Sequence, residues 1–412
     1  MACFRPFRAI RPKKDYAEKV ASRPYDVLNS EEAKIEAAGN EFSFLRVIKP
    51  EIDCGADLNP YSEEVYQKGK QNLEALKSSG VLFQENDPCF YVYRLTMDGR
   101  TQTGIVGCCD YEEYYEGKIK KHELTRTAKE EDRVRHVETQ NANAEPVFFS
   151  YRGVDRIDAL VEELIDSDFE YDFYAEDGIR HQLWVVDDAD VIAEISTMFE
   201  SVPALYVADG HHRTAAAARV GLDRKSSNSQ HNGQEEYNFF MAVLFSDSQL
   251  KIFDYNRVVR DLNGLTTQEF VESLKGSFEV VQLENAETPS RKGIFSMYLS
   301  GTWYSLLAKK LDLSGNPVQD LDVSLLSEKI LDPILGVTDL RNDQRIDFVG
   351  GIRGLCELEK RVDSGEMAVA FALFPVSMGE LLDVADAGEI MPPKTTWFEP
   401  KLRSGLFIHS LE

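Results

Sequence analysis

The chain has 412 residues, of which 43% are hydrophobic and 10% aromatic, so it is long enough for two or three domains or for one large core with a subdomain. Its 46 basic and 71 acidic residues give a formal net charge of −25, which repels nucleic-acid phosphates over most of the surface and argues against a nucleic-acid partner. No stretch approaches the ~20 apolar residues of a membrane span, and the start, MACFRPFRAIRPKK, lacks the apolar segment of a secretory signal. We therefore expect a cytoplasmic protein with no membrane partner.

The six cysteines include the neighbours Cys108 and Cys109 but form no CxxC pair. This pattern is typical of reduced thiols in a cytosolic protein rather than of a disulfide framework. We interpret Cys108 and Cys109 as packing residues of a strand, and we assign the cysteines no chemistry.

The first half of the chain predicts an alternation of helices and strands. A basic, proline-spaced start is followed by a helical pattern over 63–79 that stops at Gly80, and then by two strands joined by the hairpin signal Asp98-Gly99. After a densely charged segment, 111–145, further elements are predicted: strands at 147–153, 181–188, 203–210 and 237–245, and helices at 157–166, 188–201 and from near Arg213 to Gly221, with a mobile polar linker over 223–236.

Strands and helices alternate again beyond residue 250, and no internal repeat is present. A mixture of this kind predicts a mixed α+β protein. We divide the chain into an N-terminal segment, 1–85, a central region, 86–250, and a C-terminal α/β region, 251–412.

The stretch LYVADGHHRTAAAARVG, residues 205–221, is the strongest candidate for a site. An apolar strand delivers Asp209 and Gly210 to a turn, and a helix starts just after it; the N-terminus of a helix presents N–H groups that suit an anion. Arg213 adds positive charge, and we expect Arg219, Arg224 and Lys225 to reinforce it. The pattern indicates a phosphate site, with Asp209 either capping the helix or holding a metal ion that the phosphates share.

Two other interpretations of this stretch remain open. In the simpler one, Asp209 only caps the helix, and His211 and His212 are polar residues of its first turn. In the other, the histidines bind zinc, but adjacent histidines point in different directions and no HxxxH or CxxC pattern lies nearby to complete a tetrahedral site.

A second candidate is KIKKHELT, residues 118–125. Its lysines would keep Glu123 ionised, and an ionised glutamate beside a substrate hydroxyl can act as a general base. This role depends on Glu123 and His122 meeting the 209–213 loop in space, where 129–136 and 141–146 could supply further polar groups.

A third candidate is the stretch MPPKTTWFEPKLRSGLF near the C-terminus, which includes Lys394, Trp397, Lys401 and Arg403. It is more aromatic and polar than a solvent-exposed tail requires. Either an ordinary docked terminus or a segment packed across a cleft accounts for it.

Several segments together resemble the bacterial domain of unknown function 1015 family over essentially the whole chain. They are RPFRAIRP, RPYDVLN, KKHELT, KEEDR, ADGHHRTAAA, ILGVTDLRNDQRIDFVGG and MPPKTTWFEPKLRSGLF. The family label states no activity.

A more distant resemblance, over about 110–245, joins K-x-H-E to D-G-H-H-R and is similar to free serine kinases with the fold of ParB and sulfiredoxin. It implies a ParB/sulfiredoxin-like core with N-terminal and C-terminal additions. It also implies that Asp209, Gly210, His211, His212 and Arg213 bind nucleotide phosphates and that Glu123 is the base. The chain departs from sulfiredoxin at His211, where that protein has its reactive cysteine, and it lacks the DNA-binding helices of ParB.

We therefore predict a kinase that uses ATP or ADP with Mg²⁺ to phosphorylate a small hydroxylated metabolite, a serine-like free amino acid. Its catalytic residues would be Glu123, His122 and Asp209, with Asp209 also placed to help hold Mg²⁺. One alternative is a regulatory protein that binds nucleotide without consuming it. Another is a purely structural scaffold.

Overall fold

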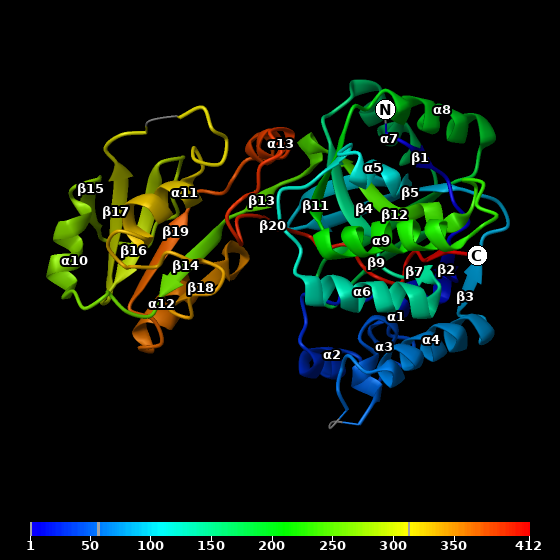
Figure 1. Ribbon diagram of the computed structural model, residues 1–412, viewed down its shortest axis with the longest axis horizontal. Helices are drawn as coiled ribbons and strands as arrows, with labels where there is room; N and C mark the ends of the chain where they lie inside the picture. Colours follow the sequence, from blue (N-terminus) through cyan, green and yellow to red (C-terminus); the bar gives the residue numbers. More distant parts are fainter. Residues whose placement is uncertain (1, 56–57, 312–313) are drawn as a thin grey trace. The chain divides into compact units, whose positions relative to one another are not determined.

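The computed structural model describes residues 2–55, 58–311 and 314–412, which form two compact units (Figure 1). Unit 1 comprises Met1–Leu250 and Pro400–Glu412, and unit 2 comprises Lys251–Glu399. The predicted division into three segments differs from this at two places, because residues 1–85 share a unit with 86–250 and because the chain returns to unit 1 at Pro400. Both units mix helices with largely antiparallel strands, which confirms the mixed α+β class.

A mixed sheet organises unit 1. In the part of the chain that the structure describes, its order is β6-β11-β8-β12-β5-β4-β10-β9, with β1 added beside β5. The β11–β6 and β12–β8 pairs are parallel, and the other neighbours are antiparallel. The strands are Phe4–Arg5 (β1), Phe90–Met97 (β4), Arg100–Asp110 (β5), Ile119–Lys120 (β6), Val147–Tyr151 (β8), Tyr171–Tyr174 (β9), Arg180–Val186 (β10), Leu205–Asp209 (β11) and Phe239–Ser246 (β12).

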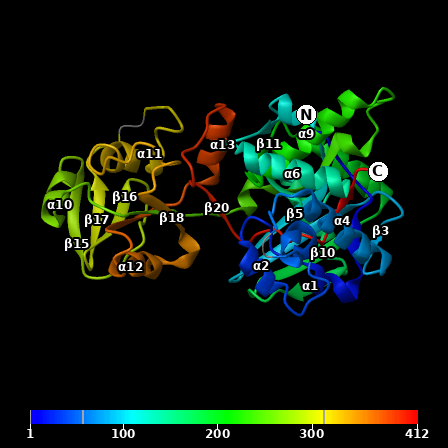
Figure 2. The same cartoon turned by 60° about the horizontal axis from the view of Figure 1, so that its bottom comes forward.

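Helices and short strands surround this sheet. Helix α6 packs against both α9 and α4 (Figures 1 and 2). The helices are Ala17–Val20 (α1), Ser30–Glu36 (α2), Leu45–Ile48 (α3), Glu63–Ser78 (α4), Glu112–Tyr115 (α5), Thr127–Gln140 (α6), Asp155–Leu164 (α7), Ala189–Glu200 (α8) and His211–Ser227 (α9). The short strands pair Ile10–Pro12 (β2) with Leu82–Gln84 (β3), and Ala142–Asn143 (β7) with His409–Ser410 (β21).

The β4–β5 hairpin forms where the sequence predicts it. Asp98 and Gly99 have φ angles of 51° and 77°, so both central residues of the turn take the left-handed conformation that matches the twist of two-residue hairpins. Every residue of β12 is buried, in keeping with the continuous apolar run of a strand covered on both faces. Cys108 and Cys109 are buried in β5, and all six cysteines are free.

The helix α9 starts at His211, close to the predicted start near Arg213. Its predicted end at Gly221 is wrong, because the helix continues through Gly221 to Ser227. A Cβ atom at Gly221 would lie 2.6 Å from the ring of Tyr111 and 2.8 Å from the Tyr237 carbonyl oxygen, so this glycine allows close packing rather than ending the helix.

The predicted linker 223–236 is also shorter than expected, since its first five residues belong to α9. Much of the remainder is tied by hydrogen bonds. The Asn228 side chain donates to the Tyr237 hydroxyl over 2.9 Å, and the carboxylate of Glu235 accepts from the backbone N–H groups of Asn232 and Gly233.

Unit 2 is built on an antiparallel sheet with the order β15-β17-β16-β19-β14-β18 in the described residues. Its strands are Ile252–Phe253 (β13), Tyr255–Val259 (β14), Phe278–Leu283 (β15), Ile294–Leu299 (β16), Thr302–Ala308 (β17), Ile346–Gly350 (β18), Val369–Leu373 (β19) and Trp397–Phe398 (β20). Its helices are Thr267–Leu274 (α10), Asp322–Leu326 (α11), Leu355–Asp363 (α12) and Met378–Asp386 (α13).

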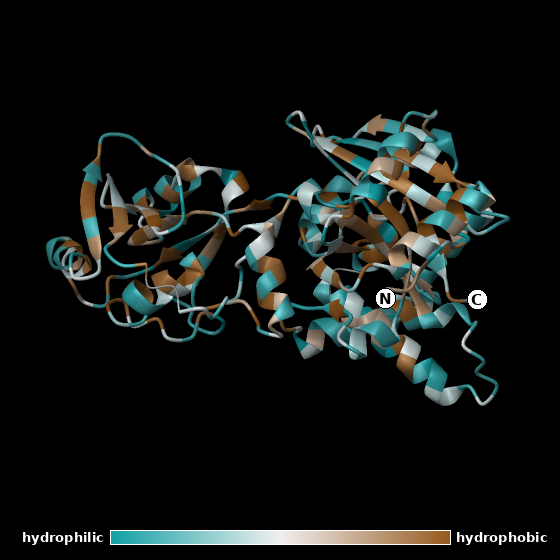
Figure 3. Cartoon of the chain, turned by 90° about the horizontal axis from the view of Figure 1, so that it is seen from above, coloured by the Kyte–Doolittle hydropathy of each residue, from teal (hydrophilic) through white to brown (hydrophobic). Residues whose placement is uncertain are grey.

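The strands in each unit are rich in apolar residues (Figure 3). A main core in unit 1 gathers β4, β5, β8 and β12 against α7 and α8, and a second core lies under α2, α3 and α4. Among the described residues, no helix combines the length and the apolar character needed to cross a membrane.

Candidate functional site

The candidate site is the junction between β11 and α9. Gly210 occupies the N-cap position with φ 92° and ψ 32°, a left-handed conformation that favours glycine. Because Gly210 has no side chain, it cannot cap the first turn as a serine or aspartate at this position would. The first turn of a long helix carries N–H groups without intrahelical partners and the positive end of the helix dipole, so the junction has the electrostatics of an anion site.

Asp209 ends β11 and faces two cations. Its Oδ2 atom lies 3.5 Å from an Arg213 nitrogen and 3.6 Å from Lys401 Nζ. Burial works to raise the pKa of Asp209, but Lys401 and Arg213 outweigh it and hold that pKa below its ordinary value. Asp209 is therefore an ionised carboxylate that holds two cations at the loop.

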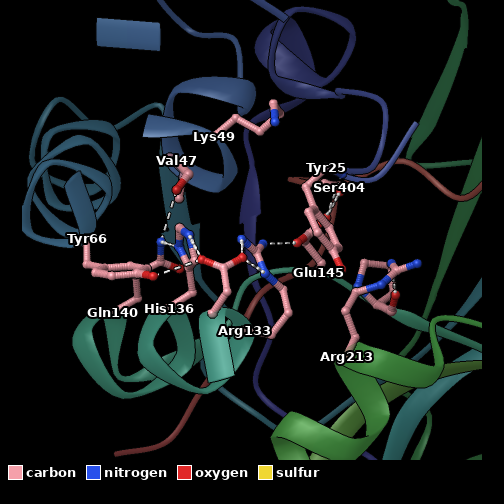
Figure 4. Close-up of polar contacts among 12 residues, drawn as sticks. Tyr25, Val47, Lys49, Tyr66, Arg133, His136, Gln140, Glu145, Arg213 and Ser404 are labelled. Carbon is pink, nitrogen blue, oxygen red and sulfur yellow. Dashed lines mark hydrogen bonds and ion pairs between the residues drawn. The ribbon is translucent and has the colours of Figure 1, made fainter. Parts of the chain in front are cut away.

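Arg213 is buried in the first turn of α9. Its Nη1 donates to the Pro146 carbonyl oxygen over 2.7 Å, whereas its Nε is buried and has no hydrogen-bond partner within the described residues. Figure 4 shows Arg213 beside the buried pair of Arg133 and Glu145, whose nearest side-chain atoms lie 3.3 Å apart. A guanidinium with a donor to spare can bind a further acceptor.

His211 packs edge-on against His122, with ring centroids 4.5 Å apart. Burial, followed by the neighbouring His122, His212 and Lys121, keeps the pKa of His211 well below its ordinary value. Its Nε2 is buried without a hydrogen-bond partner in the described part of the chain. A neutral imidazole has one donor and one acceptor nitrogen, so His211 contributes a polar group but no charge.

The segment with His122 lies directly against this loop. Burial lowers the pKa of His122 to about 4, although Asp209 and the Val207 backbone oppose the shift. His212 accepts a hydrogen bond from the backbone N–H of Arg126 over 3.0 Å, and burial lowers its pKa to about 4. These contacts hold both ends of the 122–126 segment at the start of α9.

Glu123 lies in the bend between β6 and α6 and is half-buried. Since consecutive Cα atoms are only ~3.8 Å apart, its backbone is beside the packed rings of His122 and His211. The parallel pairing of β6 with β11 fixes this proximity, with Ile119 opposite Leu205. The two predicted motifs therefore meet in space.

The expected reinforcement of positive charge by the later basic residues of α9 is wrong. Arg219 pairs with Glu131 at 2.8 Å, Arg224 pairs with Glu138 at 3.2 Å, and Lys225 pairs with Glu112. These residues follow Arg213 by two to three turns of the helix, and acidic partners neutralise them. The second cation at the loop is instead Lys401, which the residue pattern places only in a polar C-terminal stretch of undefined role.

Asp209 is predicted to help hold a metal ion, but the part of the chain that the structure describes offers few other ligands for one. Among the described residues, no group of three or more His, Cys, Asp and Glu side chains is arranged to hold a metal ion. Mg²⁺ is commonly bound through one or two carboxylates together with substrate phosphates, and Asp209 fits the carboxylate part of that description. The nucleotide would have to provide the remaining ligands.

Fold and site together define a mixed α+β protein in which a glycine turn, flanked by Arg213 and Lys401, precedes helix α9. A family model described as "Protein of unknown function (DUF1015)" matches residues 4–324, and the chain belongs to this family. No curated protein matches the chain significantly.

Similar solved structures include a free serine kinase in complex with AMP, at 14% identity and a TM-score of 0.35, covering 73% of this chain and 90% of that one. SbnI with a C-terminal truncation, from Staphylococcus aureus, has 13% identity and a TM-score of 0.40, covering 74% of this chain and 87% of its own. A conserved hypothetical protein from Pyrococcus furiosus has 15% identity and a TM-score of 0.33, with 73% and 93% covered. Because each TM-score is below 0.5, we infer function from this chain's own residues.

Proposed function

We propose that the protein binds a nucleotide at the 209–213 loop and transfers a phosphoryl group to a small hydroxylated metabolite, a serine-like free amino acid. The observation that carries the proposal is a pair of cations, Arg213 and Lys401, at a helix N-terminus in a chain of net charge −25. Arg213 and Lys401 are cationic, Asp209 is anionic, and the three histidines have lowered pKa values that leave them neutral at pH 7. A phosphate group complements this arrangement.

In the proposed reaction, the loop N–H groups and Arg213 bind the phosphates. Asp209 would help the nucleotide to hold Mg²⁺, and the ion would supply charge neutralisation for the transferring group. Glu123 accepts the proton of the acceptor hydroxyl as its oxygen attacks the terminal phosphorus. The bond from that phosphorus to the bridging oxygen breaks, and ADP leaves when ATP is the donor, or AMP when ADP is the donor. His122 contributes by packing against His211 and positioning the loop.

One observation favours a second candidate, a nucleotide sensor. Lys401 pairs with Asp209, and it belongs to the segment that returns from unit 2 to unit 1. A bound phosphate would compete with Asp209 for Lys401 and could thereby report occupancy through the C-terminal segment. A sensor would bind nucleotide without consuming it.

The test measures binding and turnover separately. Nucleotide at 100 times its Kd should stabilise the folded protein by about 2.7 kcal/mol, which a thermal shift detects. Transfer of labelled phosphate to a panel of hydroxylated metabolites should then fall ~10²- to 10⁴-fold in Glu123→Gln, with nucleotide affinity unchanged.

Glu41→Gln, which changes an exposed carboxylate in the same unit, is the matched control. Equal turnover in wild type and Glu123→Gln would contradict the role of Glu123. Tight binding without turnover for any acceptor would favour the sensor. No thermal shift with ATP or ADP would contradict both.

A further inference from the structure

A cavity in unit 1 lies outside the phosphate site described above. Its volume is about 240 Å³, and it is lined by residues within 25–30, 48–51 and 60–61 and by one face of α6. Pockets for drug-sized ligands occupy ~300–1,000 Å³, so this one suits a smaller molecule.

Most of the charged groups that line the cavity are already paired. Buried Arg133 binds Asp132 at 2.7 Å, and Lys49 binds Glu51 at 3.0 Å. His136 is buried, and burial, with the positive charge of Arg133 and its neighbours, keeps its pKa well below its ordinary value, so it is neutral. Figure 4 shows Arg133, His136 and Lys49 in this region.

Two lining residues differ from these, namely Asp26 and Lys129. Both are exposed, and within the described residues neither makes a side-chain hydrogen bond or ion pair. They carry opposite charges. The lining as a whole holds three cations and three anions, so its formal charge is zero. The unpaired charges are the positive charge of Lys129 and the negative charge of Asp26.

The cavity adjoins the phosphate site. Asp26 and Lys129 both act electrostatically on His212, the first raising and the second lowering its pKa, and Asp26 also acts on Arg213. Tyr25, which also lines the cavity, lies with its ring 3.8 Å from the Arg133 guanidinium. Arg133 lines this cavity and also lines a neighbouring cavity together with Arg213, so a ligand here would lie near the start of α9.

We propose that this cavity binds the phosphoryl acceptor and that the acceptor is a zwitterionic amino acid with a hydroxyl group. Asp26 binds its α-ammonium group and Lys129 its α-carboxylate, which leaves the side-chain hydroxyl to face the 209–213 loop. A neutral cavity with one unpaired charge of each sign discriminates against purely anionic hydroxy acids and purely cationic amino alcohols. The inference rests on the proposed function for its chemistry, but binding of the acceptor can be measured on its own.

The experiment uses the full chain, with calorimetry and phosphoryl transfer on the same acceptors. The panel is L-serine, L-threonine and L-homoserine, with D-glycerate lacking the ammonium group and ethanolamine lacking the carboxylate. We expect wild type to bind at least one amino acid, with tenfold or more preference over both single-charge analogues. Asp26→Asn and Lys129→Gln should each weaken that binding at least tenfold and leave the Kd for nucleotide unchanged.

Glu31→Gln and Lys34→Gln on neighbouring helix α2 are matched controls, because both residues are exposed and outside the cavity lining. Asp26→Asn should also lose its discrimination between L-serine and D-glycerate, which a general loss of structure would not produce. Amino-acid binding that is equal in wild type and both variants, or a larger effect on nucleotide than on acceptor, overturns the inference. Amino-acid binding without any nucleotide binding would leave this site standing and refute the proposed function.

Discussion

The conformation of Gly210 provides the sharpest test of the loop. At its φ of 92°, a residue with a side chain would destabilise the folded state by about 1–2 kcal/mol. A Cβ atom there would also be 3.2 Å from Nε and Nη2 of Arg213. Arg213 cannot move away without disturbing its hydrogen bond to the Pro146 carbonyl oxygen. Gly210→Ala should therefore both destabilise unit 1 and displace the guanidinium.

Gly178→Ala separates these two effects. Gly178 is in the same unit with φ 79°, and a Cβ atom there would meet nothing within 4 Å, so it carries the backbone cost alone. Both variants should lower the free energy of unfolding by about 1–2 kcal/mol in urea titrations. Only Gly210→Ala should lose a charge-assisted hydrogen bond to phosphate, about 1.5–3 kcal/mol, which raises the Kd for nucleotide ~10- to 150-fold in calorimetry. Equal nucleotide affinity in the two variants would refute the assignment of Arg213 as a phosphate ligand.

Three further substitutions test the surroundings of the loop. Lys401→Met should raise the Kd for ATP about tenfold, or ~1.4 kcal/mol. Because the pKa of Asp209 is lowered in the fold, Lys401 also contributes stability at pH 7. The difference in free energy of unfolding between wild type and variant, measured in urea, should therefore shrink as the pH falls below 3.8. Between pH 6.5 and about 4 the unfolded chain takes up a proton at His122 that the folded chain does not, which lowers the free energy of unfolding of wild type by about 3 kcal/mol. His122→Asn should remove this part of the pH dependence. An unchanged pH profile would contradict the neutral state of His122. Gly221→Ala should destabilise unit 1 by about 1–3 kcal/mol in urea, because the clash with the Tyr111 ring exceeds the gain in helix propensity; a more stable variant would show that the ring can shift.

Features that local sequence encodes were predicted well. The β4–β5 hairpin depends on two adjacent turn residues, Asp98 and Gly99, and the end of α4 depends on Gly80, whose φ is 72°. The strand-to-helix junction at Asp209 and Gly210 was likewise visible, because an apolar run changes to an alanine-rich one within a few residues. In each case the determining residues are sequence neighbours.

Features that depend on tertiary contacts could not be predicted in this way. From the sequence, Gly221 looks like a helix stop. The structure shows instead that the Tyr111 ring fills the space where a side chain at this position would lie. Asp209 pairs with Lys401 as well as with the nearby Arg213, and no spacing rule joins Asp209 to a residue as distant in the chain as Lys401. Asp26 gave no signal of its own, since a single exposed aspartate has many roles, and only the cavity brings it together with Lys129.

The return of the chain to unit 1 at Pro400 has a consequence for biosynthesis. Unit 2, residues 251–399, is made between β12 and the segment that carries Lys401, so a ribosome working at ~5–20 residues per second needs about 7–30 s to pass from one to the other. During that interval the nascent chain already has the 209–213 loop but lacks Lys401, and β7 lacks its partner β21. The nascent polypeptide is therefore expected to gain its complete phosphate site only after unit 2 has been translated, so that prematurely terminated chains carry an exposed, incomplete loop.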